Sequence, residues 1–495
     1  MKILAKLLIG LLAVGILGLV GVILFAPGIH ISSLSMILNV ATGSGTKTSS
    51  DALLERLRVA DGFSVSVYAR GLENPRAMAM SESGQLLITS PRSGSILRLE
   101  DTNDDLAADN SSVLIDGLTR PYGIALHNGY LYIGESNQIG RISFDSETTT
   151  VSGDYEVIIP DLGDSGNHWT KTIRFGPEGN LYVAMGSTCN VCVEADQRRA
   201  TIMRFDADGG QGEIFASGLR NSVGMDFAPW DGALYATDNG RDMLGDDYPP
   251  CELNLVKDGG FYGWPYLNGD NDPDPDFGHE RLDLQARAIP PVLHFPAHNA
   301  PLGIHFVNSD SAGWERSALV ALHGSWNRSE PDGYKVVALK WDAAGTVSSE
   351  DFLWGFEEDG DIIGRPVEIV ADGRGGFFIS DDYSGSVYRV SQGSQAVAAA
   401  LTVAPTHAQT KVVTDPQLAA AGAALYAALP CASCHSDSVA TPVSLDQVPQ
   451  RYNLTTLADY FLAPTPPMPR YELTTEQRTQ LAHYLFSQAQ LPAEK

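Results

Sequence analysis

The sequence predicts an all-β six-bladed β-propeller, with an N-terminal transmembrane helix before it and a small all-α domain after it. Three observations support this fold class. A strand cassette recurs six times between residues 56 and 392, an uncharged apolar run lies near the N-terminus, and two helical patterns follow a small, polar linker. The chain has 495 residues, which suits several domains, and its 49 glycines and 28 prolines favour a turn-rich β fold.

The charge balance excludes some classes of function. Lys and Arg total 33 against 60 Asp and Glu, so the formal net charge is -27. A nucleic-acid-binding protein needs a basic face for the phosphates, whereas the balance of this chain is acidic. The same charge disfavours adhesion of the soluble domains to anionic lipid. Hydrophobic residues make up 43% of the chain, which is enough for a packed core.

The first 29 residues are predicted to anchor the protein in a membrane. Residues 7–26 carry no charged side chain, and a helix of this length crosses about 30 Å of hydrocarbon. Lys2 and Lys6 precede this run, so the positive-inside rule places the N-terminus in the cytoplasm and the following domains outside. Residues 30–55 are then expected to form a tether. A cleaved secretory signal is the alternative, and it also predicts export.

The middle of the chain consists of one repeated cassette of strands. Its central strand, an apolar run after a turn with Gly or Asp, occurs at 83–90, 128–136, 178–186, 231–239, 316–324 and 374–382. One strand precedes each copy, and another follows it after a loop. Six units at intervals of roughly 45 to 60 residues, with one longer gap, are typical of propeller blades, whereas a β-sandwich would not give six copies in one register. A single blade cannot bury both of its faces, so we expect the ring of blades over 56–392 to close.

Propeller geometry brings particular loops together. The residues just before each first strand lie at one end of the central channel, and the loops between second and third strands lie at the same end. These positions hold three arginines and two histidines, namely Arg120, Arg220, Arg365, His168 and His323. In an otherwise acidic chain, such a basic funnel favours an anionic ligand. The alternative for each arginine alone is a solvated charge on the rim.

The C-terminal part carries a haem-attachment motif. Residues 393–414 are small and polar and predict a linker, after which Cys431-Ala-Ser-Cys434-His435 follows. In a C-x-x-C-H motif the two thiols form thioethers to the porphyrin, and the histidine ligates the iron. A redox pair or a zinc site would need only the cysteines, so the adjacent His435 favours haem c.

The surrounding residues predict a small cytochrome c domain over 415–495. Residues 415–429 and 475–487 have helical patterns, and such helices cross beside the haem in small cytochromes. Met468 lies between them in a Pro-Pro-Met-Pro segment and is the expected second axial ligand, because His with Met is the usual pair in these domains. His483 is the rival ligand, but we expect its side chain at the surface of the second helix.

Six motifs of the propeller region resemble those of the quinoprotein glucose/sorbosone dehydrogenase family. They lie at 166–192, 219–227, 237–247, 252–265, 321–329 and 364–370. The family consists of six-bladed propellers that hold pyrroloquinoline quinone (PQQ) with calcium, and the motifs are most similar to its L-sorbosone dehydrogenase branch. The C-terminal cytochrome resembles a fusion found in some members. The resemblance therefore implies PQQ and calcium as cofactors besides haem c.

The resemblance also implies a role for each residue at the end of the channel. His168 matches the family's general base, which takes the proton of the substrate hydroxyl while hydride passes to the quinone. The residues matched to the PQQ site are Arg120, Arg220, Asn221, His323 and Arg365. The backbone carbonyls of Gly240 and Arg241 match those that coordinate the calcium beside the quinone. The carboxylates of PQQ suit arginines, because guanidinium groups pair with them in bidentate fashion.

Two features of these loops leave alternatives open. The family's glucose enzymes carry an aspartate 19 residues after the base, and Ser187 stands at that position here. Another group is therefore expected to orient His168, or else the base is weaker. The loop that contains Asp238, Asp242, Asp246 and Asp247 is rich in the oxygen ligands that calcium prefers, although a solvated acidic turn is the alternative.

Three of the five cysteines lie outside the haem motif. Cys189 and Cys192 lie in a loop at the same end of the channel, and in an oxidising compartment we expect them to form a small disulfide. A catalytic redox pair is the alternative. Cys251 has no partner in sequence and is expected to be a buried free thiol.

Together these features predict a quinohaemoprotein dehydrogenase in the cytoplasmic membrane of a bacterium, with its catalytic domains on the periplasmic side. It would oxidise an alcohol or aldehyde group of a sugar-like substrate and pass electrons through the haem to a respiratory acceptor. A calcium-dependent propeller hydrolase of the lactonase type is one alternative, but hydrolysis needs no electron exit. A non-catalytic electron-transfer docking module is another, but it has no need of convergent His and Arg residues.

Overall fold

The computed structural model describes residues 53–307 and 314–393, together with 414–429, 454–462, 473–489 and the single positions 431, 435, 445, 448 and 471. The predicted anchor at 1–29 lies outside the described residues, and so does most of the predicted tether. Within the described part of the chain, no helix is long and apolar enough to cross a membrane.

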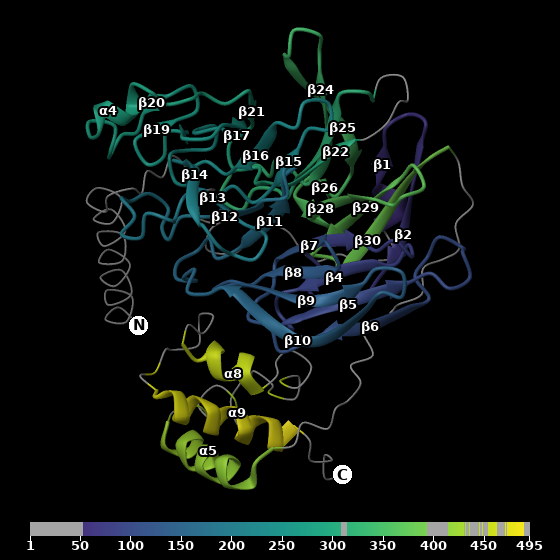
Figure 1. Ribbon diagram of the computed structural model, residues 1–495, viewed down its shortest axis with the longest axis vertical. Coiled ribbons are helices and arrows are strands. Elements are labelled where there is room, and N and C mark those ends of the chain that lie inside the picture. Colours follow the sequence, from purple (N-terminus) through teal and green to yellow (C-terminus); the bar gives the residue numbers. More distant parts are fainter. Residues whose placement is uncertain are drawn as a thin grey trace, which may run out of the picture.

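The six cassettes form six antiparallel sheets, which confirms the predicted six-bladed propeller (Figure 1). In order from the first strand of each cassette, blade 1 contains β3 (Met78–Met80), β4 (Leu86–Ser90), β5 (Ser95–Glu100) and β6 (Asn110–Ile115). Blade 2 contains β7 (Gly123–His127), β8 (Tyr130–Gly134), β9 (Ile139–Asp145) and β10 (Thr150–Ile159). Blade 3 contains β11 (Lys171–Phe175), β12 (Leu181–Met185), β13 (Thr201–Phe205) and β14 (Glu213–Ser217), and the short β18 (Gly260–Phe261) pairs with β14 in parallel.

The second half of the ring repeats this pattern. Blade 4 contains β15 (Met225–Phe227), β16 (Leu234–Asp238), β17 (Cys251–Val256) and β21 (Leu293–Phe295). Blade 5 contains β22 (Pro301–Val307), β23 (Ser317–Leu322), β24 (Lys335–Trp341) and β25 (Val347–Trp354). Blade 6 contains β28 (Pro366–Ala371), β29 (Phe377–Asp381) and β30 (Ser386–Gln392). The insertions hold two hairpins, β19 (Leu267–Asn268) with β20 (Asp272–Pro273) and β26 (Glu357–Glu358) with β27 (Asp361–Ile362), and the short helices α3 (Leu53–Arg56) and α4 (Leu282–Gln285).

The beginning of the propeller chain closes the ring. Strand β2 (Phe63–Ala69) is the fourth strand of blade 6, where Phe63 pairs with Gln392 and Val67 with Tyr388. Strand β1 (Arg58–Val59) adds to the edge of blade 5. Two blades built from the C-terminal half are thus completed by N-terminal strands, so the ring is held together by backbone hydrogen bonds between distant parts of the chain.

The core lies between neighbouring blades. The middle strands β4, β12, β16, β23 and β29 are buried along their whole length, because each faces a neighbouring blade on both sides. Six apolar clusters of side chains result, one at each junction between adjacent blades. This double burial explains why the central strands read as continuous apolar runs in the sequence.

Hydroxyl groups at one repeated position join neighbouring blades near the channel. The Oγ1 of Thr89 in blade 1 donates to the Tyr122 carbonyl at 3.2 Å, and that of Thr237 in blade 4 donates to the Leu302 carbonyl at 2.9 Å. The Oγ of Ser380 in blade 6 likewise donates to the Arg76 carbonyl at 2.7 Å, so each of these blades is fixed to the next one.

The C-terminal helices agree with the sequence prediction. Helix α5 (Pro416–Ala428) begins after Asp415, whose carboxylate accepts the backbone N–H groups of Gln417 and Leu418. Helix α9 (Thr475–Ala489) packs against α5, and a shorter helix, α8 (Leu454–Tyr460), shares their apolar cluster. The predicted haem ligands Cys434 and Met468 lie outside the described residues.

The expectation for His483 was wrong. Its side chain is buried, with 9% exposed, instead of lying at the surface of α9. The reason is that its Nδ1 accepts the backbone N–H of Asp415 at 3.0 Å. A polar ring is therefore buried at the start of α5, because it satisfies a backbone donor that precedes the helix.

The packing of α5 on α9 gives a first prediction. A Cβ at Gly422 would lie 2.0 Å from the Gln480 carbonyl oxygen, so Gly422→Ala must push the two helices apart. We expect a destabilisation of about 1–3 kcal/mol for such overpacking. Hydrogen exchange in peptides that cover α5 and α9 would measure it. Ala424→Gln on the exposed side of α5 is the control, because Gln is also a good helix former. Exchange rates in Gly422→Ala equal to those of this control would contradict the close helix contact.

Candidate active site

The segments before the first strands and the loops after the second strands meet at one end of the channel, which we call the mouth. Acidic side chains that end second strands fix several of these segments. Asp238, at the end of β16, accepts the backbone N–H groups of Arg220 and Asn221. Asp381, at the end of β29, accepts that of Arg365 at 2.9 Å. The sequence-predicted mouth residues are thus held by the blade that they precede.

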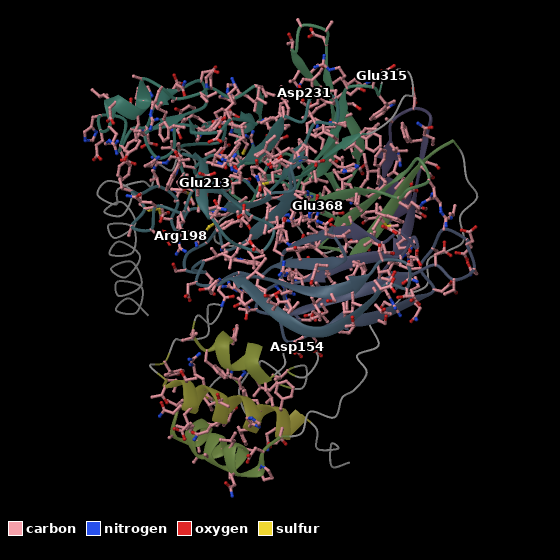
Figure 2. The ribbon with its side chains drawn as sticks, in the orientation of Figure 1. Asp154, Arg198, Glu213, Asp231, Glu315 and Glu368 are labelled. Carbon is pink, nitrogen blue, oxygen red and sulfur yellow. A yellow bond between two sulfur atoms is a disulfide. The ribbon has the colours of Figure 1, made fainter. Side chains whose placement is uncertain are left out.

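Side chains fill the channel below the mouth. An apolar cluster there takes one residue from each of five blades: Tyr122, Trp169, Val223, Leu302 and Val367. An ion pair of 3.5 Å joins Arg174 of blade 3 to Glu368 of blade 6, which is labelled in Figure 2. Because these contacts cross the channel, a ligand at the mouth has a closed floor.

Ser187 orients the imidazole of His168. The Nδ1 atom of His168 lies 2.8 Å from the Ser187 hydroxyl oxygen and 3.1 Å from the Ser187 carbonyl oxygen. The carbonyl can only accept, and the hydroxyl already donates its single hydrogen to the Cys189 carbonyl at 2.7 Å. Nδ1 therefore carries the ring hydrogen and Nε2 carries the lone pair. Ser187 thus orients His168, the role that the aspartate at this position has in the family's glucose enzymes.

The mouth keeps the His168 ring neutral. Desolvation and the nearby Arg220 guanidinium lower the pKa of His168 from its usual 6.5 to about 3. A neutral imidazole with a free Nε2 lone pair can accept a proton at physiological pH.

Two buried cations hold the His168 segment without a carboxylate partner. Arg199 is 3% exposed and donates to five backbone carbonyls, those of Gly163, Ser165, His168, Gly186 and Ser187. Lys171 is fully buried, and its Nζ donates to the carbonyls of Ser136, Gly163 and Trp169. Neither cation forms an ion pair with a carboxylate among the described residues. Burial lowers the pKa of Lys171 to about 7 and also lowers that of Arg199.

Gly186 brings His168 and Asn221 close together. A Cβ at Gly186 would lie 2.5 Å from the His168 Cβ and 2.7 Å from the Asn221 Oδ1. A side chain would therefore displace one of them, which explains the glycine here. The predicted base and the predicted quinone contact Asn221 are neighbours across it.

Arg220 belongs to the wall of the mouth. Its side chain is 3% exposed and donates to the carbonyls of Asn190 and Asn239, to the Asn190 Oδ1 at 2.9 Å and to the Asp242 carboxylate at 3.0 Å. With all its nitrogens engaged, Arg220 fixes two loops and lowers the pKa of His168. Its direct contact with a quinone stays a prediction.

His323 and Arg365 lie side by side. The Nε2 of His323 donates to the Asp382 carboxylate at 2.8 Å, and Arg76 pairs with the same carboxylate at 2.6 Å. The Arg365 guanidinium donates to the carbonyls of His323 and Gly324 and keeps Nη1 without a protein partner among the described residues. Desolvation and Arg365 lower the pKa of His323 to about 4.

Arg120 stands at another side of the mouth. Its side chain pairs with Asp164 at 2.7 Å and lies over the Trp169 ring at 4.9 Å from the ring centre. Its side chain is 41% exposed, and its contact with a quinone stays a prediction.

Gly240 and Arg241, the predicted calcium residues, are neighbours in one loop, but their surroundings differ. Arg241 is fully buried, and its side chain pairs with Asp274 at 2.6 Å and Asp276 at 3.0 Å. Gly240 is part of a small cavity that Asp238 and Glu252 also line. Coordination of calcium by the two backbone carbonyls stays a prediction.

The acidic loop does not form a carboxylate cluster. Asp238 holds backbone N–H groups, Asp242 accepts from Arg220 and Asn327, Asp246 accepts from Ser329, and Asp247 pairs with Arg328. Among the residues described, the one group of three close metal-ligating side chains is Cys189, Cys192 and Glu194. These aspartates therefore accept hydrogen bonds from other parts of the protein. The sequence had suggested either a calcium-binding loop or a solvated acidic turn, and neither suggestion included these contacts.

The cysteine predictions are confirmed. Cys189 and Cys192 form a disulfide, and Cys251 is a buried free thiol. Sequence reasoning missed the roles of Arg199, Lys171, Asn190 and Asp382. The sequence shows only an arginine in a loop at position 199, and the burial and carbonyl partners of this arginine depend on the tertiary fold.

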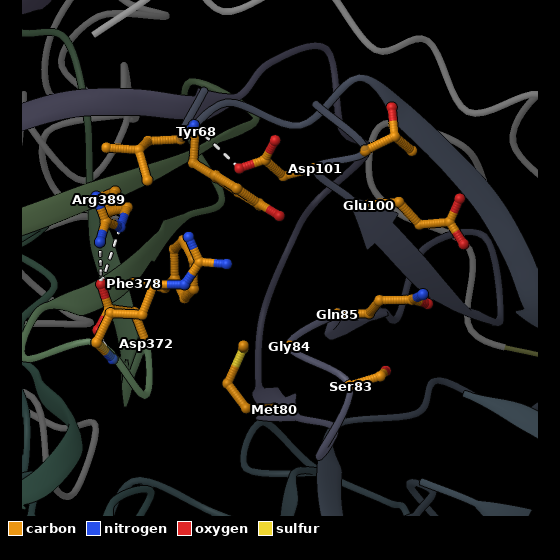
Figure 3. A pocket seen from close by; sticks show the side chains of 13 residues that line it. Tyr68, Met80, Ser83, Gly84, Gln85, Glu100, Asp101, Asp372, Phe378 and Arg389 are labelled. Carbon is orange, nitrogen blue, oxygen red and sulfur yellow. Dashed lines mark hydrogen bonds and ion pairs between the residues drawn. The ribbon is translucent and has the colours of Figure 1, made fainter. Parts of the chain in front are cut away.

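A separate cavity of about 370 Å³ lies away from the mouth (Figure 3). Its lining includes the buried ion pair of Arg389 with Asp372, at 2.6 Å, and the ring of Tyr68. The turns that join first to second strands contribute Ser83 and Arg374, so the cavity is on the face of the ring opposite to the mouth, between blades 6 and 1. None of the predicted site residues lines it.

The role of Ser187 gives a second prediction. Ser187→Asp places a carboxylate beside Nδ1, which stabilises the imidazolium, whereas the similarly sized Ser187→Asn adds no charge. We expect the aspartate to raise the pKa of His168 by about one to three relative to the asparagine variant. Titration of the His168 ring resonances by NMR would measure this. Equal pKa values in the two variants would contradict the contact between Ser187 and His168.

The family of the chain follows from its known relatives. A family model described as TrAA12-like matches residues 57–253 and 282–393, more than half of the chain. An uncharacterised protein of Borreliella burgdorferi is 30% identical over 377 residues, which cover 72% of this chain and 97% of that protein. The pyrroloquinoline quinone-dependent pyranose dehydrogenase of Coprinopsis cinerea is 26% identical over 411 residues, and the chain spans 55% of that enzyme's length. A solved structure of a Trichoderma reesei carbohydrate-active enzyme of family AA12 has a TM-score of 0.61 and 21% identity, with 71% of this chain and all of that chain covered, so the two share a fold. The chain belongs to the TrAA12-like family.

Proposed function

We propose that the propeller is a PQQ-dependent dehydrogenase of sugar-like substrates. The observation that carries this proposal is His168, whose neutral ring presents the Nε2 lone pair at the mouth. The relatives supply the substrate class, because the Coprinopsis cinerea protein is named a PQQ-dependent pyranose dehydrogenase and a Hypocrea jecorina relative a PQQ-dependent sugar dehydrogenase.

The mouth residues fit an anionic quinone. Nη1 of Arg365 has no hydrogen-bond partner in the part of the chain that the structure describes, Arg120 is half-exposed, and Asn221 lies next to His168. Asn299, 1% exposed at the head of β22, has neither its amide donor nor its acceptor satisfied by a described residue. Cationic and amide donors of this kind suit carboxylate and carbonyl oxygens. We assign Arg120, Asn221, His323 and Arg365 to hold PQQ, with Arg220 behind them and calcium on the Gly240 and Arg241 carbonyls.

PQQ held by these residues would supply the hydride acceptor for the substrate carbon. The chain's own contribution is the proton: His168 accepts it from the substrate hydroxyl at Nε2. Ser187 stabilises the charged ring, because its two oxygens accept from Nδ1–H throughout. Arg199 keeps the ring in place through the His168 and Ser187 carbonyls. Removing the proton in the transition state favours oxidation of an alcohol or a hydrated aldehyde, which includes a sorbosone-type substrate.

The alternatives have less support. A lactonase-like hydrolase would need a calcium centre that activates substrate or water, and the loop carboxylates are occupied with protein donors. A docking module would not need a base that is held in one tautomer. The dehydrogenase explains both the neutral histidine and the basic mouth.

For the electron exit we propose a c-type haem. Cys431 and Cys434 would carry it, and His435 and Met468 would ligate the iron. Helices α5 and α9 occupy the positions of the two predicted cytochrome helices, which supports the proposal of a cytochrome c domain. An N-terminal anchor and a periplasmic location would place the haem near a respiratory acceptor in the membrane.

The third prediction concerns the base. His168→Gln removes the proton acceptor, so we expect turnover with excess PQQ and calcium to fall by about 10²–10⁴-fold. Because the wild-type pKa of His168 is about 3, the acid limb of its activity should lie far below pH 6.5, since only protonation of the base causes that loss. Dye reduction with pyranoses and direct measurement of bound quinone would test both points.

His294→Gln is the matched control, because His294 lies on the outer strand of blade 4 and pairs with Asp270. Full quinone occupancy with turnover within a few-fold of wild type would show that His168 is not the base. His323 would then take that role.

The fourth prediction concerns the haem. Met468→Ala should lower the reduction potential, because loss of the thioether removes the ligand that raises it. His483→Gln should leave the potential unchanged, since Nδ1 of His483 is engaged with Asp415. Spectroelectrochemical titration of the full chain measures both variants. A potential that changes only in the His483 variant would reverse the ligand assignment.

A further inference from the structure

The loop after the second strand of blade 3 contains a ring closed by a disulfide. Cys189 and Cys192 are joined and enclose two residues, Asn190 and Val191. Both cysteines are half-buried at the mouth. We call residues 189–192 the disulfide ring.

The disulfide ring is connected to His168 by hydrogen bonds. The Cys189 carbonyl accepts the hydrogen of the Ser187 hydroxyl at 2.7 Å. This contact directs the Ser187 lone pairs toward Nδ1 of His168, 2.8 Å away. The position of Cys189 therefore decides which atom of Ser187 faces the imidazole.

Hydrogen bonds also connect the disulfide ring to Arg220 in the wall of the mouth. Asn190 accepts from Arg220 at its carbonyl and at Oδ1, both at 2.9 Å. Its Oδ1 also accepts the Asp242 N–H at 2.7 Å, and its Nδ2 donates to the Asp242 carbonyl at 3.0 Å. Asp242 in turn accepts from Asn327 of blade 5. One enclosed residue thus joins blade 3 to blade 4, and through Asp242 to blade 5.

The base of the loop is fixed separately. Glu194 accepts the backbone N–H and the hydroxyl of Thr188. Thr188 packs so closely on Gly166 that a Cβ there would lie 2.0 Å from the Thr188 carbonyl oxygen. Thr188 thus holds the loop against Gly166 in the segment before His168, independently of the disulfide ring.

We propose that the disulfide ring is a positioning element of the active site, sensitive to reduction, that holds His168 and Arg220 in their working arrangement. The proposal rests on the proposed function. Opening the ring frees Cys189 and Asn190 together. The Ser187 hydroxyl then loses the Cys189 carbonyl that orients it, and Arg220 loses its two acceptors on Asn190. Water then reaches the mouth, and both the desolvation and the fixed guanidinium that keep His168 neutral are weakened.

The reduction itself is a thiol–disulfide exchange with a dithiol. Its first thiolate attacks one cysteine sulfur and forms a mixed disulfide, and its second thiol closes on that bond. The Cys189–Cys192 bond is broken, two cysteine thiols form, and the dithiol becomes a cyclic disulfide, so two electrons and two protons are transferred. The Glu194 carboxylate, 3.9 Å from both sulfurs, repels an incoming thiolate and slows this step.

Treatment of the full chain with a dithiol, followed by its removal, tests the proposal. Thiol alkylation and mass spectrometry establish that Cys189 and Cys192 are reduced. We expect turnover to fall by roughly ten- to a hundred-fold, with a smaller change in KM for the sugar and little change in the unfolding temperature. We also expect the pKa of His168, followed by NMR, to rise toward its usual value.

Variants separate the ring from general stability. Cys189→Ala/Cys192→Ala should have the low turnover of the reduced protein and no further response to dithiol. Asn190→Ala keeps the disulfide and should reproduce the loss of turnover, so it decides the question if the double variant does not fold. Cys251→Ala is the control and should respond to dithiol like the wild type, because Cys251 is buried in blade 4.

Three results would overturn the proposal. One is unchanged turnover and an unchanged His168 pKa in reduced protein and in Asn190→Ala. Another is a loss of activity that only follows the unfolding temperature. The third is stoichiometric zinc binding by the reduced cysteines and Glu194 with an unchanged His168 pKa, which would make the group a metal site. The NMR measurement needs no turnover, so failure of the proposed dehydrogenase activity would be recognised separately.

Discussion

The arrangement of the mouth depends on two buried cations that use backbone carbonyls as their partners. Arg199 and Lys171 together gather the carbonyls of the 163–169 and 186–187 segments, and Gly163 serves both. A buried charge is costly unless its N–H groups are hydrogen-bonded. The carbonyls that accept from Arg199 and Lys171 are therefore held in place. This requirement converts two irregular loops into a rigid support for His168. Arg199 forms no ion pair with a carboxylate among the described residues, and its charge helps to keep the His168 imidazole neutral.

Individual blades of the propeller add further support to the mouth. A residue at the end of a second strand accepts the backbone N–H of the mouth segment that leads into its blade, as Asp238 and Asp381 do. Hydroxyls of Thr89, Thr237 and Ser380 then fix one blade to the next. Because these contacts lie within a closed ring, they help the mouth residues to keep their positions although the residues come from segments far apart in the sequence. Rigid surroundings of this kind are what a proton-transfer site requires.

Much of the fold could be predicted because its signals are local or periodic. Six apolar cassettes predicted six blades, and helical patterns predicted α5 and α9 within a few residues. The prediction for His483 failed because the sequence shows an amphipathic position but not the Asp415 N–H that the ring accepts. The acidic loop was interpreted by composition, whereas its aspartates are divided among Arg220, Asn327, Ser329 and Arg328. Composition indicates charge, but partners across blades depend on ring closure.

The sequence alone determined the number of blades, the end of the channel where the predicted site residues gather, and the residue types found there. These follow from strand periodicity and from the position of each residue within its cassette. The tertiary structure alone decided how those residues are used. It made Ser187 the acceptor that fixes the tautomer of His168, placed Arg220 in the wall, and left Arg365 with one donor that no described residue accepts. The physical reason is that a tautomer and a lowered pKa are set by contacts within about 3–6 Å, and these contacts join residues from different blades.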